Sequence, residues 1–204
     1  MEHLTVLTRG LASLGTGDRT MVAPSDVDQG ARNDCFLMAA MASIAHQHPD
    51  PDAWLRGLVK ANPRGSYTVR FRDGKNVTVY PTFGRGHAVS DDPNEVWPAL
   101  IEKAYGMAYG DNRKAEQHAL AQGGITGVAM EKLTGHPSQY IPPDKLTWDD
   151  LAAYQAQGQA ITVATYHDPT QGRDKRGVAN NHPAYKSNLY GEKLNQWHMY
   201  YVDR

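Results

Sequence analysis

The sequence predicts an α+β fold with helices first and strands last, arranged as a helical lobe and a sheet lobe. An apolar run without Gly or Pro at residues 35–45 predicts a helix buried on nearly every side. β-Branched and aromatic residues at 66–72 and 76–80, joined by a short turn, predict a β-hairpin. The same residue types at 160–166 and 197–202 predict two more strands near the end of the chain.

Residues that cap or break helices predict where the first two helices begin and end. Asn33 and Asp34 precede the apolar helix, and both are common N-cap residue types. The prolines that follow His48 end it, because proline disfavours helix in the residue before it. A second helix is predicted over 94–109, where apolar residues recur at helical spacing and Pro98 falls in the first turn.

The remaining segments predict two short helices and two irregular regions. One helix covers 125–134 and closes at Gly135. The other covers 147–157, with Thr147 as its cap and acidic residues in its first turn. Few apolar residues occur in 1–28, so we expect an irregular arm there. No core pattern occurs in 167–193, so we expect a loop there.

Composition excludes several classes of protein. The chain has 204 residues, with 21 Lys+Arg against 22 Asp+Glu, so no overall basic field attracts nucleic acid. No apolar run approaches the ~20 residues that span a bilayer, and the N-terminus lacks the pattern of a signal peptide. We expect an N-terminal arm or linker at 1–28 and a single domain at 29–204.

The only cysteine, Cys35, stands at the predicted start of the buried helix. One cysteine cannot form an internal disulfide or a multi-cysteine zinc site. The unpaired N–H groups at a helix start stabilise a thiolate, so this position predicts a lowered thiol pKa and a usable nucleophile. A small apolar residue that fills the core is the alternative interpretation.

Gln29, six residues before Cys35, favours the nucleophile. Its side-chain amide and the backbone N–H of Cys35 are two donors that can stabilise one developing oxyanion, at about 3 kcal/mol for each donor. Gly30 and Ala31 are small, which lets this loop pass close to a substrate. Gly30, Asp34 and Trp197 are candidate binding residues, and Trp197 can also shield the catalytic pair from water or belong to the core.

Three sequence blocks resemble the core of calpain-type cysteine proteases. They are Gln29-Gly30-Ala31-Arg32-Asn33-Asp34-Cys35-Phe36-Leu37-Met38-Ala39-Ala40, Glu95-Val96-Trp97-Pro98-Ala99-Leu100-Ile101-Glu102-Lys103-Ala104-Tyr105, and Gly123-Gly124 with Leu133-Thr134-Gly135. The family has Gly where this chain has Asn33, and Trp where it has Phe36. The resemblance implies a papain-like two-lobe fold, with a central helix carrying the nucleophile and a sheet carrying a histidine.

A cysteine nucleophile needs a general base, and two histidines are candidates. His198 begins the run His-Met-Tyr-Tyr-Val within the predicted strand 197–202, in a pattern similar to the family's, and lies 163 positions after Cys35. His182 lies 147 positions after Cys35, nearer the usual spacing, but Pro183 disfavours a paired strand there. Few residues follow His198, so the family's third catalytic residue is not found, and Asp203 on the same strand is a poor candidate. A shortened chain, a catalytic dyad or an upstream Asp or Asn are the alternatives.

Other acidic and histidine clusters are interpreted without a metal or cofactor. His46 and His48 lie at a helix end beside prolines and lack further ligands. By analogy with the family, four acidic residues are candidates for a calcium site: Asp50, Asp52, Asp91 and Asp92. They lack the regular alternation of ligands that a calcium loop has, so we interpret them as helix caps and turn residues.

The sequence therefore predicts a cysteine endopeptidase whose partner is a protein substrate. A deamidase, acyltransferase or amidase with the same thiol chemistry is one alternative, and a catalytically inactive binding module is the other. We expect a secreted bacterial effector or toxin domain that acts in a target-cell cytoplasm, or otherwise a cytoplasmic protein. A cognate inhibitor or immunity protein would then occupy its cleft.

Overall fold

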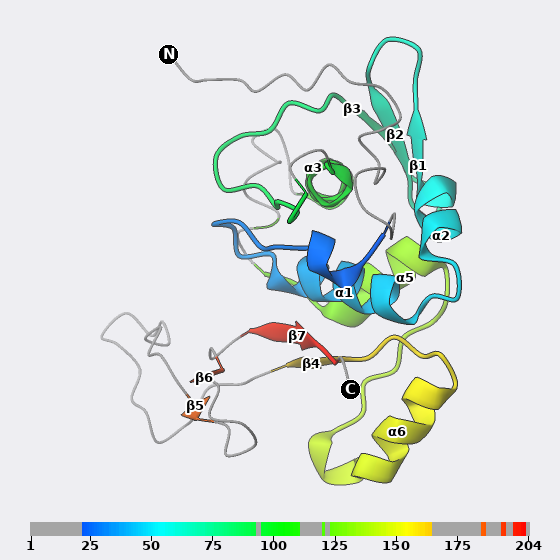
Figure 1. The fold of residues 1–204 in the computed structure, drawn as a ribbon, viewed down its shortest axis with the longest axis vertical. Coiled ribbons are helices and arrows are strands. Elements are labelled where there is room, and N and C mark those ends of the chain that lie inside the picture. Colours follow the sequence, from blue (N-terminus) through cyan, green and yellow to red (C-terminus); the bar gives the residue numbers. More distant parts are fainter. Residues whose placement is uncertain are drawn as a thin grey trace.

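Helix α1 (Cys35–Gln47) lies at the centre of the computed structural model, which describes residues 22–92, 95–110, 120, 123–164, 185–186, 193–194 and 198–202. Figure 1 shows α3 and strands β1–β3 on one side of α1 and strands β4 and β7 on the other. The structure therefore mixes helices and small sheets around one buried helix, as the α+β prediction requires.

The predicted apolar helix is confirmed, and it is buried as its composition requires. Every residue from Phe36 to Ala45 is buried. Asp34 is the N-cap residue, but its side chain makes no capping hydrogen bond. The backbone carbonyl of Asp34 instead accepts the N–H groups of Leu37 at 2.8 Å and Met38 at 3.1 Å, which closes the first turn.

The predicted β-hairpin belongs to a three-stranded antiparallel sheet in the order β1-β2-β3. Strands β2 (Tyr67–Arg70) and β3 (Asn76–Val79) form the hairpin, and β1 (Val59–Ala61) pairs with β2. β1 follows directly from α2 (Pro51–Leu58). Neither β1 nor α2 was predicted, because the prolines after α1 were interpreted only as the end of that helix.

Three further helices match their predictions. α3 (Trp97–Tyr109) begins three residues later than the predicted range, with proline in its first turn. α5 (Thr126–Thr134) ends at Gly135, whose φ of 78° is the left-handed cap that favours glycine. α6 (Trp148–Ala156) carries a capping box between Thr147 and Asp150. Single 3₁₀ turns occur at Pro24–Asp26 and Pro143–Lys145.

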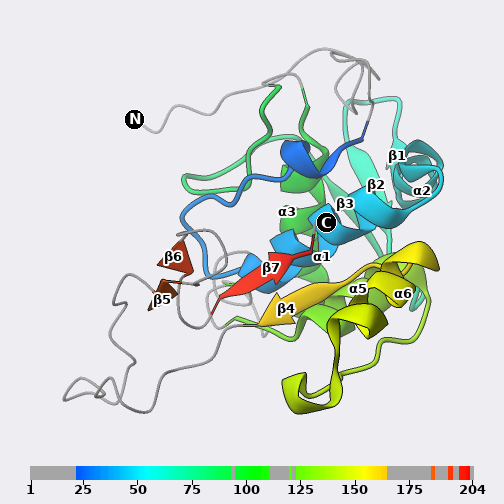
Figure 2. The same ribbon diagram turned by 60° about the horizontal axis from the view of Figure 1, so that its bottom comes forward.

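The last two predicted strands pair with each other. β4 (Thr162–Ala164) is antiparallel to β7 (Met199–Tyr201), with Ala164 opposite Met199. Figure 2 shows β7 lying along α1 with β4 beside it. The predicted loop at 167–193 contains strand β5 (Tyr185–Lys186), which pairs with β6 (Lys193–Leu194), so that part of the prediction was wrong.

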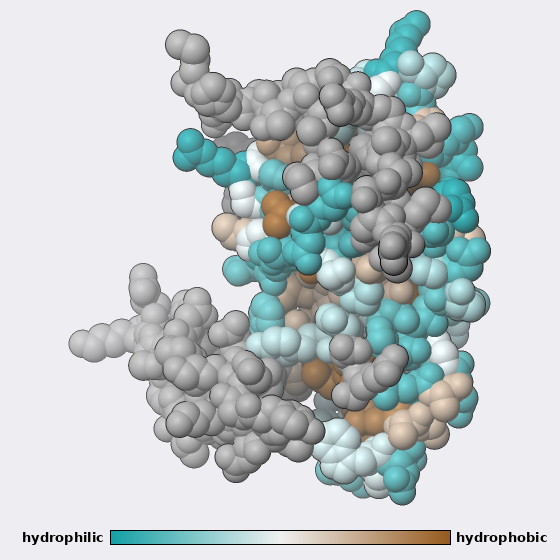
Figure 3. Space-filling model, in the orientation of Figure 1, coloured by the Kyte–Doolittle hydropathy of each residue, from teal (hydrophilic) through white to brown (hydrophobic). Residues whose placement is uncertain are grey.

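The core joins α1 to its neighbours through large apolar side chains. Trp97 is fully buried, packs edge-on against Trp54 at 5.9 Å, and donates its indole N–H to Asp26 at 3.2 Å. Val22 and Asp26 are also buried, so this part of the predicted arm packs on the core. On the face drawn in Figure 3, hydrophilic residues cover the region of α2 and β1–β3. Among the described residues, no helix is both long and apolar enough to cross a membrane.

Candidate active site

Cys35 is the first residue of α1, as the sequence predicts, and its side chain is half-buried. Its sulfur accepts a hydrogen bond from the backbone N–H of Met199, at the start of β7. Met199 directly follows His198, which is also half-buried and packs edge-on against Tyr200 at 4.8 Å. The fold therefore brings the predicted nucleophile to the strand that carries the predicted base, although they are far apart in the sequence.

Burial sets the ionisation of both groups. It raises the pKa of the Cys35 thiol, and this effect outweighs the N–H groups of Met199, Phe36 and Cys35 itself, which lower the pKa. The expectation of a lowered pKa at the helix start was therefore wrong, because it omitted the burial of the sulfur. Burial also lowers the pKa of His198. Both shifts favour a neutral thiol beside a neutral imidazole.

Gln29 lies in a loop that leads into α1, and its side-chain amide points back to that loop. Its Nε2 donates to the carbonyl oxygen of Arg32 at 2.6 Å. An amide NH₂ group has two hydrogens, and this bond uses one of them. The arrangement fixes the orientation of the Gln29 side chain at the entrance to the helix that begins with Cys35.

The loop from Asp28 to Arg32 is pressed against residues 84–89. Asp28 and Val89 exchange two backbone hydrogen bonds at 3.0 Å, and Ala31 donates its N–H to Gly86 at 3.0 Å. A Cβ on Gly30 would overlap the carbonyl groups of Gly86 and His87. Gly30 is therefore required by this backbone contact, and its predicted role near a substrate stays a prediction.

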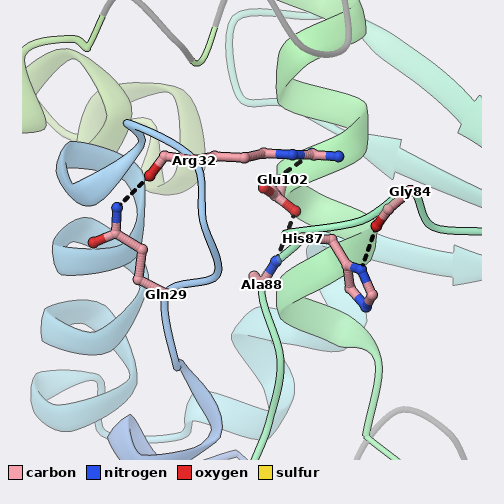
Figure 4. A network of polar contacts seen from close by, with 6 residues as sticks. All are labelled: Gln29, Arg32, Gly84, His87, Ala88 and Glu102. Carbon is pink, nitrogen blue, oxygen red and sulfur yellow. Dashed lines mark hydrogen bonds and ion pairs between the residues drawn. The ribbon is translucent and has the colours of Figure 1, made fainter.

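Arg32 and Glu102 form a buried ion pair, which sequence reasoning missed. Arg32 Nη1 lies 2.9 Å from Glu102 Oε1, and Glu102 Oε2 accepts the N–H of Ala88 at 3.0 Å (Figure 4). Asp34 is buried against Glu102, and its pKa is raised to about 8 by burial, by the hydrogen bond to Glu102 and by the Glu102 charge. The only sequence signal was an acidic residue inside the apolar stretch of α3. The predicted part of Asp34 in binding stays a prediction.

All three calpain-like blocks meet beside Cys35. Phe36 from the first block packs edge-on against Tyr105 from the second at 5.9 Å. A Cβ on Gly124, from the third block, would lie 2.7 Å from the Phe36 ring, so only glycine fits without a shift. Phe36 therefore takes the place between these blocks that the resemblance gives to a larger aromatic residue.

Several other predicted residues are placed differently or not at all. His182, Trp197 and Asp203 lie outside the described residues. His46 packs against the Tyr201 ring, and Asp50 caps α2 by accepting the Ala53 N–H at 2.8 Å. Across the described parts of the chain, no three or more His, Cys, Asp or Glu side chains gather as a metal-ion site.

Comparison with known proteins identifies the family. The sequence profile of the calpain family cysteine protease matches residues 18–202. The chain belongs to the calpain family. Calpain-A of Drosophila melanogaster is 31% identical over 151 residues, covering 68% of this chain and 16% of that protein. A calpain-type cysteine protease of Zea mays, DEK1, is 31% identical over 180 residues, covering 79% of this chain and 8% of that protein.

This chain therefore shares its descent with the cysteine proteases of the calpain family. It spans less than a fifth of the length of these two relatives, 16% and 8%. The family assignment accounts for the three blocks around Cys35.

Proposed function

We propose that this calpain family member is a cysteine endopeptidase with Cys35 as nucleophile and His198 as general base. The observation that carries the proposal is the hydrogen bond from the Met199 N–H to the Cys35 sulfur, because it brings the residue next to His198 to the nucleophile. Half-burial of both side chains gives them a partly water-excluded environment while leaving each open to a substrate.

The proposed reaction starts from the neutral pair. His198 takes the thiol proton as the Cys35 sulfur attacks the carbonyl carbon of the substrate peptide bond. The carbonyl π electrons move to oxygen, giving a tetrahedral intermediate. As the intermediate collapses, the C–N bond breaks and the imidazolium protonates the departing amine. Water, deprotonated by His198, then hydrolyses the thioester and restores the thiol.

The oxyanion is proposed to accept two hydrogen bonds. One comes from the backbone N–H of Cys35, which has no intrahelical acceptor because Cys35 begins α1. The other comes from the Gln29 amide, whose second hydrogen is not needed for the bond to Arg32. Each such donor contributes about 3 kcal/mol to the stabilisation of the transition state.

The proposal includes a papain-like arrangement of two lobes. Helix α1 packs against α3 on one side and against β4 and β7 on the other, as Figure 1 shows. The nucleophile and the histidine strand then belong to different lobes. A substrate would bind where the two lobes meet, next to Cys35.

The test is mass spectrometry of a denatured protein after incubation with the chain. A peptidase creates new peptide termini, whereas a deamidase converts glutamine to glutamate without cleavage. We expect new termini with the wild type and with His182→Ala, and none with His198→Ala. Loss of cleavage in His182→Ala with cleavage retained in His198→Ala would contradict the assignment of the base. Glutamine conversion alone would favour the acyl-transfer alternative.

The effector or toxin role, with a cognate inhibitor as partner, stays a prediction. Growth of a bacterium that expresses the chain, compared with the same strain expressing Cys35→Ala, tests it. Equal growth of the two strains would remove its support.

A further inference from the structure

The Arg32–Glu102 ion pair connects the loop before the nucleophile to the buried face of α3. Only 1% of the Glu102 side chain and 12% of the Arg32 side chain are exposed. Taking two charges out of water costs several kcal/mol for each ion, so such a pair persists only with good geometry and further hydrogen bonds. Because Arg32 belongs to the loop that carries Gln29, the ion pair restrains that loop.

Glu102 holds two chain segments at once. Its Oε1 pairs with Arg32 at 2.9 Å, and its Oε2 accepts the Ala88 N–H at 3.0 Å. The segment around Ala88 in turn binds the loop before α1, because Gly86 accepts the N–H of Ala31 at 3.0 Å. The carboxylate thus fixes the loop directly, through the Arg32 side chain, and indirectly, through residues 86–88.

Arg32 passes this constraint to the Gln29 side chain. Its guanidinium is held by Glu102, and its carbonyl oxygen accepts the Gln29 Nε2 at 2.6 Å. Figure 4 shows this series of contacts from Gln29 through Arg32 and Glu102 to Ala88. The amide that is proposed to bind the oxyanion is therefore oriented by a residue that α3 holds in place.

Asp34 extends the same network to the residue next to Cys35. Its carboxyl is buried against Glu102, and burial together with that neighbour raises its pKa to about 8. A protonated Asp34 donates to the Glu102 carboxylate, so one proton lies between the two carboxyl groups. Two points of the loop, Arg32 and Asp34, are then tied to one glutamate.

We propose that Glu102 is a positioning residue for catalysis, which acts through Arg32 to hold the Gln29 amide where the oxyanion forms. The inference rests on the proposed function, because it assumes that Gln29 stabilises an oxyanion. In this proposal Glu102 and Arg32 act on the reaction through Gln29 and the loop before Cys35. A misplacement of about 1 Å in such a site costs about a hundredfold in rate.

Two reactions of Cys35 distinguish a misplaced Gln29 amide from a general disruption of the site. Hydrolysis of a peptide needs the oxyanion donors, whereas alkylation by iodoacetamide is a displacement at carbon that forms no oxyanion. Loss of the Arg32–Glu102 contact is therefore expected to lower kcat while the KM and the alkylation rate change little.

The experiment compares Glu102→Gln and Arg32→Ala with Glu131→Gln, the same chemical change at a partly exposed acid on α5. It measures kcat and KM for an unstructured peptide, the rate of Cys35 alkylation by iodoacetamide from the intact mass, and the midpoint of thermal unfolding. We expect kcat to fall about ten- to hundredfold in the first two variants, with KM and alkylation within about threefold of wild type. Glu131→Gln keeps the wild-type kcat, and Arg32→Lys recovers part of what Arg32→Ala loses.

Two results would overturn the inference: wild-type kcat in folded Glu102→Gln and Arg32→Ala, or a parallel loss of kcat and alkylation. If Glu102→Gln does not fold, Arg32→Ala and Arg32→Lys decide the matter, because the Arg32 side chain is the more exposed partner. Absence of Cys35-dependent hydrolysis in the wild type would instead overturn the proposed function and the inference with it. Normal wild-type hydrolysis with unchanged variants overturns the inference alone.

Discussion

Cys35 is subject to two opposing influences, and their balance determines its reactivity. The N–H groups of Phe36 and Cys35 at the helix start, and that of Met199 in β7, lower its pKa. The effect of burial is larger and raises the pKa, so Cys35 is a neutral thiol in the absence of substrate. His198 has the complementary property, because burial lowers its pKa and keeps the imidazole able to accept a proton. In the proposed reaction the proton therefore stays on the Cys35 sulfur until a substrate binds.

The resting thiol predicts the pH dependence of Cys35 alkylation. Because its pKa is raised, the rate with iodoacetamide should keep increasing above about pH 8.5, the ordinary value for cysteine. The measurement is the rate of mass increase of the intact chain between about pH 5 and pH 10, with Cys35→Ala as the control that does not react. A rate that reaches its plateau below about pH 7 would show a preformed thiolate and contradict this account.

Helix α1 is both the centre of the core and the element that carries the proposed nucleophile. It also contacts the segment that leads into β4 through Ser43, which is fully buried and donates its hydroxyl to the Ile161 carbonyl at 2.9 Å. This bond joins the middle of α1 to the residue before β4, and β4 pairs with the strand that follows His198. The geometry between Cys35 and His198 thus depends on contacts along the whole helix.

Loss of the Ser43 hydroxyl should lower the stability of the fold. Ser43→Ala removes this donor while the Ile161 carbonyl keeps the Val202 N–H at 3.0 Å. We expect the free energy of unfolding to fall by about 0.5–1.5 kcal/mol, the net contribution of one hydrogen bond. Chemical denaturation measures the change. Ser138→Ala, which removes a hydroxyl bound to Glu131 on the exposed surface, is the matched control and should cost less. Equal effects of the two substitutions would contradict the role of Ser43 in joining α1 to β4.

Elements with strong local signals could be predicted from the sequence. The apolar run of α1, the hairpin of β2 and β3 and the capping box at Thr147 each depend on nearby residues. α2 was missed because Pro51 serves as its first residue while the prolines around it read as a stop. The Arg32–Glu102 pair and the Met199–Cys35 bond could not be predicted, because each joins residues that only the tertiary fold brings together.

At the scale of the whole molecule, buried polar groups tie distant segments around α1. Asp26 accepts the Trp97 indole N–H, Glu102 pairs with Arg32, and the Trp54 indole N–H bonds the Leu133 carbonyl at 3.1 Å. These contacts connect the segment before α1 to α3, and α2 to α5. Removing one partner of such a contact leaves a buried polar group unsatisfied, so their loss is costly.

The raised pKa of Asp34 predicts how the free energy of unfolding changes with pH. Its pKa is about 8 in the fold and about 3.9 in the unfolded chain. The folded state therefore holds a proton that the unfolded state has lost, and stability falls as the pH rises through this window. The lowered pKa of His198 contributes an opposite and smaller slope near about pH 6.5, where the unfolded histidine is half protonated, and almost none by about pH 8. The difference between the wild type and Asp34→Asn over about pH 6.5 to pH 8 therefore isolates the contribution of Asp34.

Denaturation of the wild type and of Asp34→Asn at several pH values in that range tests this prediction. The wild type should lose stability with rising pH, and Asp34→Asn should change much less, because asparagine does not titrate. Asp144→Asn, at an exposed acid, is the control and should keep the wild-type slope. A wild-type stability that does not fall over this range would contradict the buried, protonated state of Asp34.

The most direct test of the central claim is the hydrolysis of an unstructured peptide by the wild type and by Cys35→Ala. Cys35→Ala removes only the sulfur from a half-buried position, so the thermal unfolding midpoint should stay close to that of the wild type. The account predicts Cys35-dependent cleavage with new peptide termini, and no cleavage above the uncatalysed rate by folded Cys35→Ala. Cleavage by Cys35→Ala at the wild-type rate would show that Cys35 is not the nucleophile.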